Sequence, residues 1–162
     1  MSARRSTGFG MKVIYHNRSR LGPEIEGASN KAEYVSKQEL FAQADHLVIV
    51  VPYSPEAHHL VGADELAMMK PSACLVNVAR GGIVDDAALI AALKEKKIAA
   101  AGLDVFEGEP VVHPGLLQVP NVVLTPHLGA WSAESLKTKT EIVARNLEAF
   151  FAGQPVLTPV GH

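Results

Sequence analysis

The chain has 162 residues, of which 48% are hydrophobic and 20% charged, and its formal net charge is −2. This size and composition are typical of one globular domain, and the near-neutral charge gives no electrostatic basis for binding nucleic acid or an anionic membrane. The single cysteine, Cys74, excludes an intramolecular disulfide and fits a reducing compartment, and its apolar surroundings predict a small buried side chain. No apolar run approaches the ~20 residues of a membrane span, and no signal-peptide core follows Arg4 and Arg5, so we expect a cytoplasmic protein.

The N-terminal half predicts short elements separated by turns. In chain order these are a tail or helix end at 1–10, a strand at 11–16, a loop through Gly22, Pro23 and Gly27, an extended piece at 34–35, a helix from Ser36 to about Ala44 and a strand at 46–51. The helix is indicated by Ser36 and Glu39, which have the Ser-x-x-Glu spacing of a capping box.

The C-terminal half alternates helices and strands more clearly. Its predicted elements are a helix at 63–69, a buried strand at 73–78, a helix at 86–95, a strand at 98–104, a loop at 105–120, a strand at 122–124 and a final helix at about 132–152. The final helix carries an apolar stripe formed by Leu136, Val143, Leu147 and Phe150. Strands that alternate with helices predict an α/β fold, a parallel sheet wound with helices on both faces.

One part of such a fold is not found in the sequence. A dinucleotide-binding domain begins with a strand, a Gly-x-Gly-x-x-Gly turn and a helix. Gly8 and Gly10 begin that pattern, but Val13 stands in the third glycine position and the segment precedes a strand. We therefore expect a Rossmann-like doubly wound parallel sheet that lacks its first strand and glycine-rich loop, so that the strand at 11–16 lacks its inner neighbour. Either the chain is a piece of a longer protein, or the open edge is paired in another way or by a second molecule.

The stretch at 75–86 predicts a strand, a tight turn and a helix start. Gly81 and Gly82 permit a sharp turn and a close approach to a ligand, and Asp85 suits the N-cap of the next helix. Because ligands of open α/β sheets bind at the carboxyl ends of the strands, Arg80 is well placed to bind an anion.

Further polar residues follow the next two strands. Asp104 ends one strand, with Glu107 and Glu109 just beyond it, and His127 follows the other. An arginine can bind a substrate carboxylate with two hydrogen bonds, and a histidine beside a carboxylate can donate or accept the proton of a hydroxyl. We choose Glu109 as that carboxylate because the following proline stiffens its loop. The catalytic set predicted from these residues is Arg80, Glu109 and His127, with a bound nucleotide as hydride carrier.

The end of the strand at 11–16 bears on the choice of that nucleotide. NAD enzymes place an acid there to bind the ribose 2′-hydroxyl, whereas this chain has Asn17, Arg18 and Ser19. Arg18 with Ser19 suits a 2′-phosphate, so we predict NADP(H), with NAD(H) as second choice. The adjacent His58 and His59 have no carboxylate at ligand spacing in the sequence, and we expect no metal site.

Three separated segments resemble the D-isomer-specific 2-hydroxyacid dehydrogenases, most closely the glyoxylate/hydroxypyruvate reductases. They are Asn77 to Asp86 (NVARGGIVDD), Gly102 to Pro110 (GLDVFEGEP) and Asn121 to Gly129 (NVVLTPHLG).

The resemblance implies reduction of a small 2-keto acid to a D-2-hydroxy acid. In that reaction Arg80 binds the carboxylate and carbonyl, His127 is the acid/base and Glu109 its partner. The residues that the resemblance places at the cofactor are Val51, Pro52, Val78, Ala79, Arg80, Asp104, His127 and Gly129. It further implies a homodimer, with 11–130 an incomplete dinucleotide-binding domain and 131–162 a helix and tail that pack on a separate substrate domain.

Two other interpretations remain. The histidine pair and the aromatic Trp131 also resemble the C-terminal-binding corepressors, which share this fold and act as dinucleotide-sensing interaction proteins. The residues at 17–19 argue against that branch, which uses NAD. A third interpretation is a non-catalytic piece that keeps only a dimerisation surface, and dinucleotide binding separates it from the other two.

Overall fold

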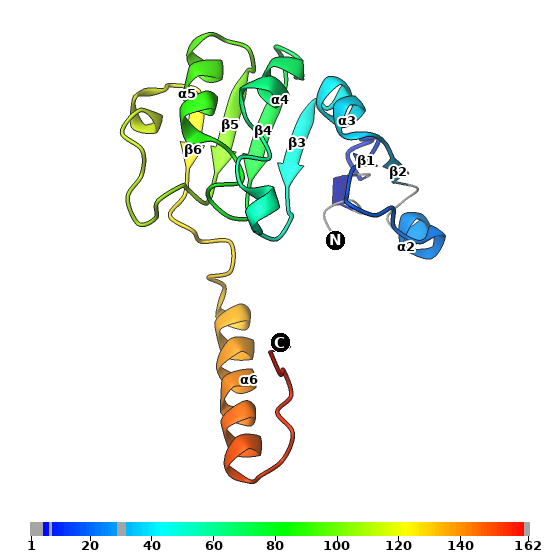
Figure 1. Cartoon of the computed structure of the whole chain (residues 1–162), viewed down its shortest axis with the longest axis vertical. Helices are drawn as coiled ribbons and strands as arrows, with labels where there is room; N and C mark the ends of the chain where they lie inside the picture. Colours follow the sequence, from blue (N-terminus) through cyan, green and yellow to red (C-terminus); the bar gives the residue numbers. More distant parts are fainter. Residues whose placement is uncertain (1–4, 7, 29–31, 161–162) are drawn as a thin grey trace. The chain divides into compact units, whose positions relative to one another are not determined.

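The computed structural model describes residues 5–6, 8–28 and 32–160, and the chain divides into two compact units, Met1–Thr125 and Pro126–His162 (Figure 1). Of the tail expected at 1–10, residues 1–4 and 7 lie outside the described part. None of the described helices is long and apolar enough to cross a membrane.

Strands and helices alternate along the first unit. Its elements are β1 (Ile14–Tyr15), α2 (Pro23–Ala28), β2 (Glu33–Tyr34), α3 (Lys37–Gln43), β3 (His46–Ile49), a 3-10 turn (Pro55–Ala57), α4 (Ala63–Met68), β4 (Cys74–Asn77), α5 (Asp86–Lys94), β5 (Ala100–Leu103), a second 3-10 turn (Leu116–Gln118) and β6 (Val122–Leu124). Most predicted elements are therefore present; four of the strands are two to four residues shorter than expected, and the other two have the expected length.

Four strands form one parallel sheet in the order β3-β4-β5-β6. Leu75 at its centre pairs with Leu47 of β3 and with Ala101 of β5. All four carboxyl ends therefore meet at one edge, where loops after β3, β4 and β5 come together. This arrangement confirms the α/β, Rossmann-like fold class.

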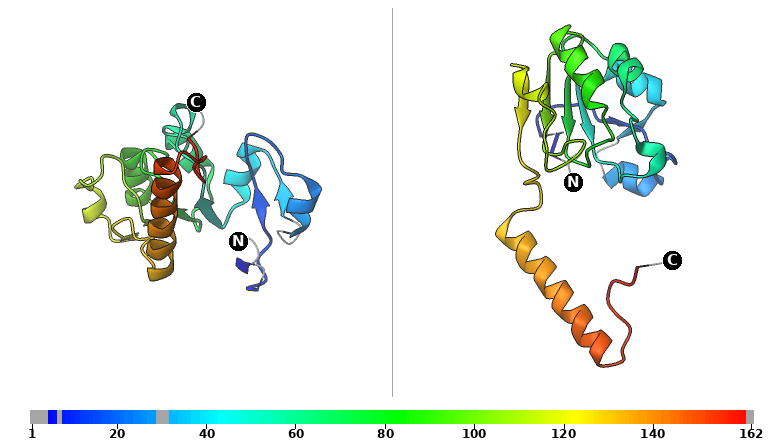
Figure 2. Two further views of the ribbon diagram at one scale, coloured as in Figure 1. Left: turned by 90° about the horizontal axis from the view of Figure 1, so that it is seen from below. Right: turned by 60° about the vertical axis from the view of Figure 1, so that its left-hand side comes forward.

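The strand predicted at 11–16 belongs to a second, two-stranded sheet. Ile14 of β1 pairs in parallel with Glu33 of β2. Within the described ranges β1 has no other strand neighbour, and β3 pairs only with β4. Figure 1 and the left view of Figure 2 show the two sheets separated, with α3 connecting β2 to β3. The expectation that this strand lacks an inner neighbour is confirmed for the described residues.

The loop predicted through Gly22, Pro23 and Gly27 is wrong, because α2 forms there. Proline is well tolerated in the first turn of a helix, and Glu24 and Glu26 place negative charge at its positive end. The Gly22 carbonyl accepts hydrogen bonds from the N–H groups of the residues three and four positions later. The helix has six residues and none of them is buried, so it leaves no apolar periodicity in the sequence.

Local capping signals are confirmed. The Ser36 Oγ accepts from the Glu39 N–H at 3.2 Å while the Glu39 carboxylate accepts from the Ser36 N–H at 2.9 Å, as the capping box predicted for α3. Asp85 caps α5 by accepting from the Ala88 N–H at 3.0 Å. Both caps fix where the helices begin.

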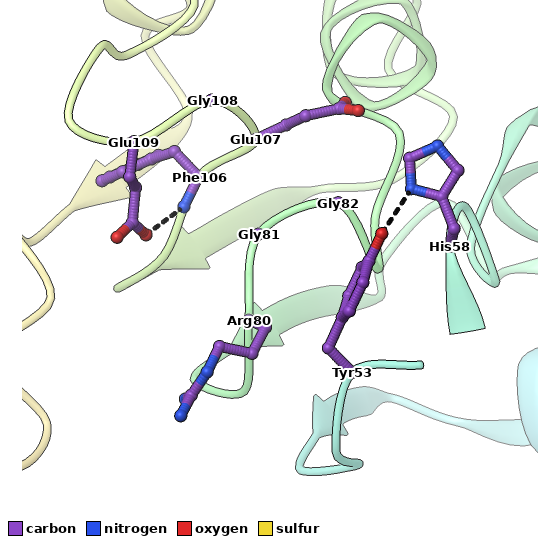
Figure 3. A pocket seen from close by; sticks show the side chains of 9 residues that line it. All are labelled: Tyr53, His58, Arg80, Gly81, Gly82, Phe106, Glu107, Gly108 and Glu109. Atoms are coloured by element: carbon purple, nitrogen blue, oxygen red, sulfur yellow. Dashed lines mark hydrogen bonds between the residues drawn. The ribbon is translucent and has the colours of Figure 1, made fainter. Parts of the chain in front are cut away.

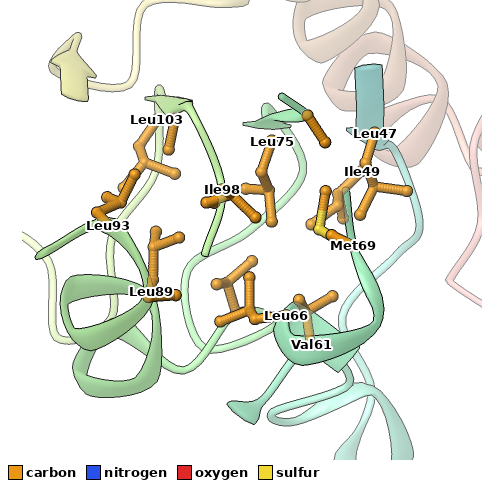
Figure 4. Packing of buried hydrophobic residues seen from close by; sticks show 14 of the residues in the cluster. Leu47, Ile49, Val61, Leu66, Met69, Leu75, Leu89, Leu93, Ile98 and Leu103 are labelled. Atoms are coloured by element: carbon orange, nitrogen blue, oxygen red, sulfur yellow. The ribbon is translucent and has the colours of Figure 1, made fainter. Parts of the chain in front are cut away.

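The core lies on one face of the four-stranded sheet. Figure 4 shows Leu66 of α4, and Leu89 and Leu93 of α5, packed against the side chains of the strands. Burial alternates along β4, where Leu75 is buried and Cys74 is half-buried. The expectation of a buried Cys74 in a fully buried strand at 73–78 is therefore wrong, since the structure covers one face of β4 fully and the other only in part.

The second unit is built on α6 (Ala133–Phe151). Ser132 caps this helix by accepting from the Ser135 N–H at 3.1 Å. The tail after the helix folds back, because the Asn146 side chain accepts from the Leu157 N–H at 2.8 Å and donates to Thr158 Oγ1 at 2.7 Å. The apolar stripe of Leu136, Val143, Leu147 and Phe150 is exposed.

Candidate active site

The turn after β4 is organised by Asn77, the last residue of that strand. Its side chain is buried and spans the turn: Oδ1 accepts from the Ala79 N–H at 3.1 Å, and Nδ2 donates to the Arg80 carbonyl at 3.0 Å. The Arg80 guanidinium donates to the Ala79 carbonyl at 2.7 Å. Asn77 thus fixes the backbone from which Arg80 projects at the carboxyl edge of the sheet.

The loop after β5 supplies the acidic side of the same edge. The Glu109 carboxylate accepts from the Phe106 N–H at 2.9 Å, which folds this loop back on itself. One cavity is lined by both loops and by the segment after β3, as Figure 3 shows. Its lining residues are Tyr53, His58, Arg80, Gly81, Gly82, Phe106, Glu107, Gly108 and Glu109. The structure therefore brings Arg80 and Glu109 to one cavity, as the sequence predicted.

Asp104 lies deeper at this edge, directly after β5. Its backbone N–H donates to the Asn77 carbonyl at 3.0 Å, and its carboxylate accepts from the Thr125 hydroxyl at 2.6 Å. Only 8% of Asp104 is exposed. Asp104 is thus held between the ends of β4 and β6, and these hydrogen bonds fix the position of its side chain.

A second groove joins the ends of β3 and β4. It is lined by Val50, Val51, Pro52, Tyr53, Val78, Ala79 and Arg80. The exposed fractions of Val50 and Val78 are 65% and 47%, so the groove presents apolar surface to solvent. This lining fits one face of a flat aromatic ring such as that of nicotinamide. Among the described residues no Gly-x-Gly-x-x-Gly turn joins a strand to a helix, so the diphosphate half lacks the cradle that such a turn provides.

Two arginines in the segment after β1 differ in their contacts. The Arg20 guanidinium binds the Glu26 carboxylate at 2.9 and 3.0 Å, and Tyr15 donates to the same carboxylate at 2.6 Å. The hydrogen bonds from Arg20 and then Tyr15 lower the pKa of Glu26 to about 2. Arg18 is exposed and takes no part in this pair, and the Asn17 carbonyl accepts from the Tyr34 hydroxyl at 3.2 Å.

His127 is the second residue of the other compact unit. It is exposed, its φ is 53°, and Gly129 follows it before the cap of α6. Arg80 and Glu109 belong to the first unit, so the convergence of all three catalytic candidates stays a prediction.

One contact at this edge was missed in the sequence. The His59 Nε2 lies 3.0 and 3.2 Å from the two Glu107 carboxylate oxygens, and its Nδ1 lies 3.8 Å from Asp85 Oδ2. His59 and Glu107 are 48 residues apart, so no local spacing could indicate the pair. The sequence indicated this contact only indirectly, because parallel strands place the loops that follow them at the same edge of the sheet.

A family model matches residues 1–129, and its description is the NAD binding domain of D-isomer specific 2-hydroxyacid dehydrogenase. Glyoxylate reductase of Thermococcus gammatolerans is 48% identical over 152 residues, which cover 94% of this chain and 45% of the relative. Glyoxylate/hydroxypyruvate reductase B of Enterobacter agglomerans is 44% identical over 155 residues, which cover 95% and 47%. The chain spans about half the length of the curated relatives it matches.

Solved structures agree with this match. The holo form of Rhodotorula graminis D-mandelate dehydrogenase superposes with a TM-score of 0.91 and 39% identity, over 99% of this chain and 47% of that one. The NADPH-dependent glyoxylate/hydroxypyruvate reductase of Sinorhizobium meliloti, in complex with NADP and malonate, superposes with a TM-score of 0.89 and 38% identity, over 98% and 48%.

Proposed function

This chain belongs to the D-isomer specific 2-hydroxyacid dehydrogenase family, and we propose that it carries the catalytic edge of an NADP(H)-dependent reductase of small 2-keto acids. The observation that carries the proposal is that Arg80 and Glu109 line one cavity at the carboxyl ends of neighbouring strands. The names of the relatives favour glyoxylate or hydroxypyruvate as the keto acid.

Arg80 is proposed to bind the substrate. A guanidinium offers paired N–H donors that match a carboxylate, and one further N–H can polarise the adjacent carbonyl oxygen. The Asn77 side chain supports this role because it holds both the Ala79 N–H and the Arg80 carbonyl. A fixed backbone reduces the conformational freedom that Arg80 loses on binding.

His127 is proposed to donate a proton to the carbonyl oxygen as the hydroxyl forms. A carboxylate that binds the other ring nitrogen fixes the tautomer and stabilises the charged imidazole. We assign Glu109 to that partner role, which requires its carboxylate to lie beside the His127 ring during the reaction.

The cofactor is proposed to lie along the groove between β3 and β4. Bound NADPH supplies the hydride that reduces the keto carbon. Val51, Pro52, Val78 and Ala79 would hold its nicotinamide end, and Asp104 and Gly129 would lie near it. At the other end, Arg18 with Asn17 and Ser19 would bind the 2′-phosphate, since Arg20 is already paired with Glu26.

The experiment is a titration of the chain with NADPH and NADH by calorimetry, followed by an assay of NADPH oxidation with glyoxylate and hydroxypyruvate in the presence of a chelator. We expect NADPH to bind more tightly and both keto acids to be reduced. Arg80→Gln should lower kcat/KM about 100-fold or more, because the substrate carboxylate loses its charged donor. Arg145→Gln, a change of an exposed arginine on α6, is the matched control.

The outcomes separate the three interpretations. Dinucleotide binding without keto acid reduction would favour the interaction-protein alternative, and an absence of any dinucleotide binding would favour a non-catalytic piece. Equal affinity for NADPH and NADH, unchanged in Arg18→Ala, would overturn the assignment of the 2′-phosphate to Arg18.

A further inference from the structure

His58 and His59 lie against Glu107 at the mouth of the cavity described above. Each of the three side chains offers one ligand atom, and these atoms all lie within 4.8 Å of one another. We propose that the three residues form a binding site for a divalent transition-metal ion, with Zn²⁺ as the ion that fits best. Within the part of the chain that the structure describes, no other group of three such residues comes together in this way.

The ligand chemistry favours zinc over the hard cations. Two imidazole nitrogens and one carboxylate oxygen are a common zinc set, and they leave a fourth position for water. Mg²⁺ and Ca²⁺ prefer sites made mostly of oxygen atoms, so neither should compete at similar concentration.

Each histidine also has a polar neighbour of the kind that orients metal ligands. The His59 Nε2 faces the Glu107 carboxylate at 3.0 Å while its Nδ1 lies 3.8 Å from Asp85 Oδ2. The His58 Nδ1 lies 3.2 Å from the Tyr53 hydroxyl, so Nε2 is the nitrogen that His58 offers to an ion. A contact from the second ring nitrogen to a carboxylate or hydroxyl favours the tautomer that leaves the other nitrogen available to an ion, and it raises ligand basicity.

The half of the site formed by His59 and Glu107 is already held in place. His59 has a φ of 50°, and its backbone N–H donates to the Gly82 carbonyl at 2.7 Å. The His58 and His59 rings stack with centroids 3.9 Å apart. A metal lies in the plane of each imidazole that binds it, so the exposed His58 ring must turn out of this stack to complete the set.

The surrounding charge also suits a cation. Asp85 lies beside His59, and the buried Asp86 has an Oδ2 atom without a hydrogen-bond partner among the described residues. Figure 3 shows the Arg80 side chain extending away from His58 and Glu107, toward the other end of the cavity. A cation at the histidine pair would therefore be attracted by three carboxylates and kept apart from the one arginine that lines the cavity.

The test uses the whole chain and needs neither keto acid nor dinucleotide, so its result is independent of the proposed function. Zn²⁺ is titrated into metal-free protein by calorimetry, and thermal unfolding is recorded with and without one equivalent of the ion. We expect one ion to bind per chain and to raise Tm, an effect that a chelator reverses. Mg²⁺ at the same concentration should do neither.

Variants locate the site. Glu107→Gln and His58→Gln should each weaken zinc binding at least 10-fold, because the loss of an outer-shell partner of a ligand alone costs about 10- to 100-fold in metal affinity. His59→Asn should abolish it while keeping a residue that tolerates the positive φ. Glu95→Gln and His46→Gln, at exposed positions outside the cluster, are the matched controls.

Circular dichroism of the metal-free variants checks their fold. If His59→Asn does not fold, the two other ligand variants decide the question. An absence of saturable zinc binding, or an affinity unchanged in Glu107→Gln and His58→Gln, would overturn the proposal.

Discussion

Gly81 packs directly against the backbone of Phe106, so the turn after β4 and the loop after β5 touch without any side chain between them. A Cβ atom built on Gly81 would overlap the carbonyl group of Phe106 and lie 2.8 Å from the Glu107 nitrogen. This contact joins the residue next to Arg80 to the loop that carries Glu109. The spacing between Arg80 and Glu109 therefore depends on the absence of a side chain at position 81.

The first prediction concerns this contact. Gly81→Ala must push the two loops apart, because the atoms that a methyl group meets are backbone atoms that cannot rotate away. We expect a loss of about 3 kcal/mol in the free energy of unfolding, measured by urea denaturation. Gly102→Ala, on β5, is the control: a Cβ there meets only a Val76 methyl at 3.9 Å, and its stability should change little. Equal stability of the two variants would contradict the close packing at Gly81.

The second prediction concerns Asn77, a residue that is 1% exposed. Asn77→Ala leaves the Ala79 N–H and the Arg80 carbonyl without their partner, which should cost about 2 kcal/mol. Asn121→Ala removes a single hydrogen bond at the surface, from Nδ2 to the Ala99 carbonyl, and should cost less than half as much. Chemical denaturation of both variants measures the difference, and a similar loss in both would argue against a buried, two-bond role for Asn77.

The third prediction concerns the pH dependence of stability. Burial raises the pKa of Asp86 above its ordinary value of 3.8. The folded chain therefore holds more protons than the unfolded chain between these two values, and stability falls as pH rises through that window. Asp86→Asn removes this effect while keeping the size of the side chain. Relative to the unchanged protein, its free energy of unfolding should increase as pH rises above 3.8 and then level off.

The difference between the two proteins is the quantity to follow, because it cancels the titration of all other groups. A difference that is flat or falls between pH 4 and pH 7 would contradict a raised pKa of Asp86.

The fourth prediction concerns Glu26, whose pKa of about 2 results first from its hydrogen bond with Arg20 and then from that with Tyr15. Because this value lies below the ordinary 4.5, Glu26 favours folding above that pH, and its contribution is lost as pH falls toward 2. Arg20→Ala should return the pKa most of the way to 4.5, as an NMR titration of the carboxyl carbon would show. Tyr15→Phe should raise it less, and the reverse order would contradict the assignment of causes.

Local signals in the sequence were sufficient wherever a feature depends on neighbours along the chain. Two helices begin directly after the predicted capping residues Ser36 and Asp85, because the hydrogen bonds of a cap join groups within four residues of one another. Alternation of strands and helices gave the α/β class, and the chain order of the strands placed Arg80 and Glu109 at one edge. The helix α2 was not predicted because it has no buried face, and a helix is recognised in a sequence by the apolar periodicity of such a face.

Only the tertiary structure decided which residues that are far apart in the sequence come into contact. Cys74 is half-buried because the structure covers one face of β4 fully and the other only in part. His59 meets Glu107 because parallel strands bring successive loops to the same edge, across a sequence separation that carries no periodic signal. Residue types and local hydrogen bonds thus determined the elements and the chemistry available to this protein. The packing of those elements decided which side chains share a cavity, because that depends on contacts between distant segments.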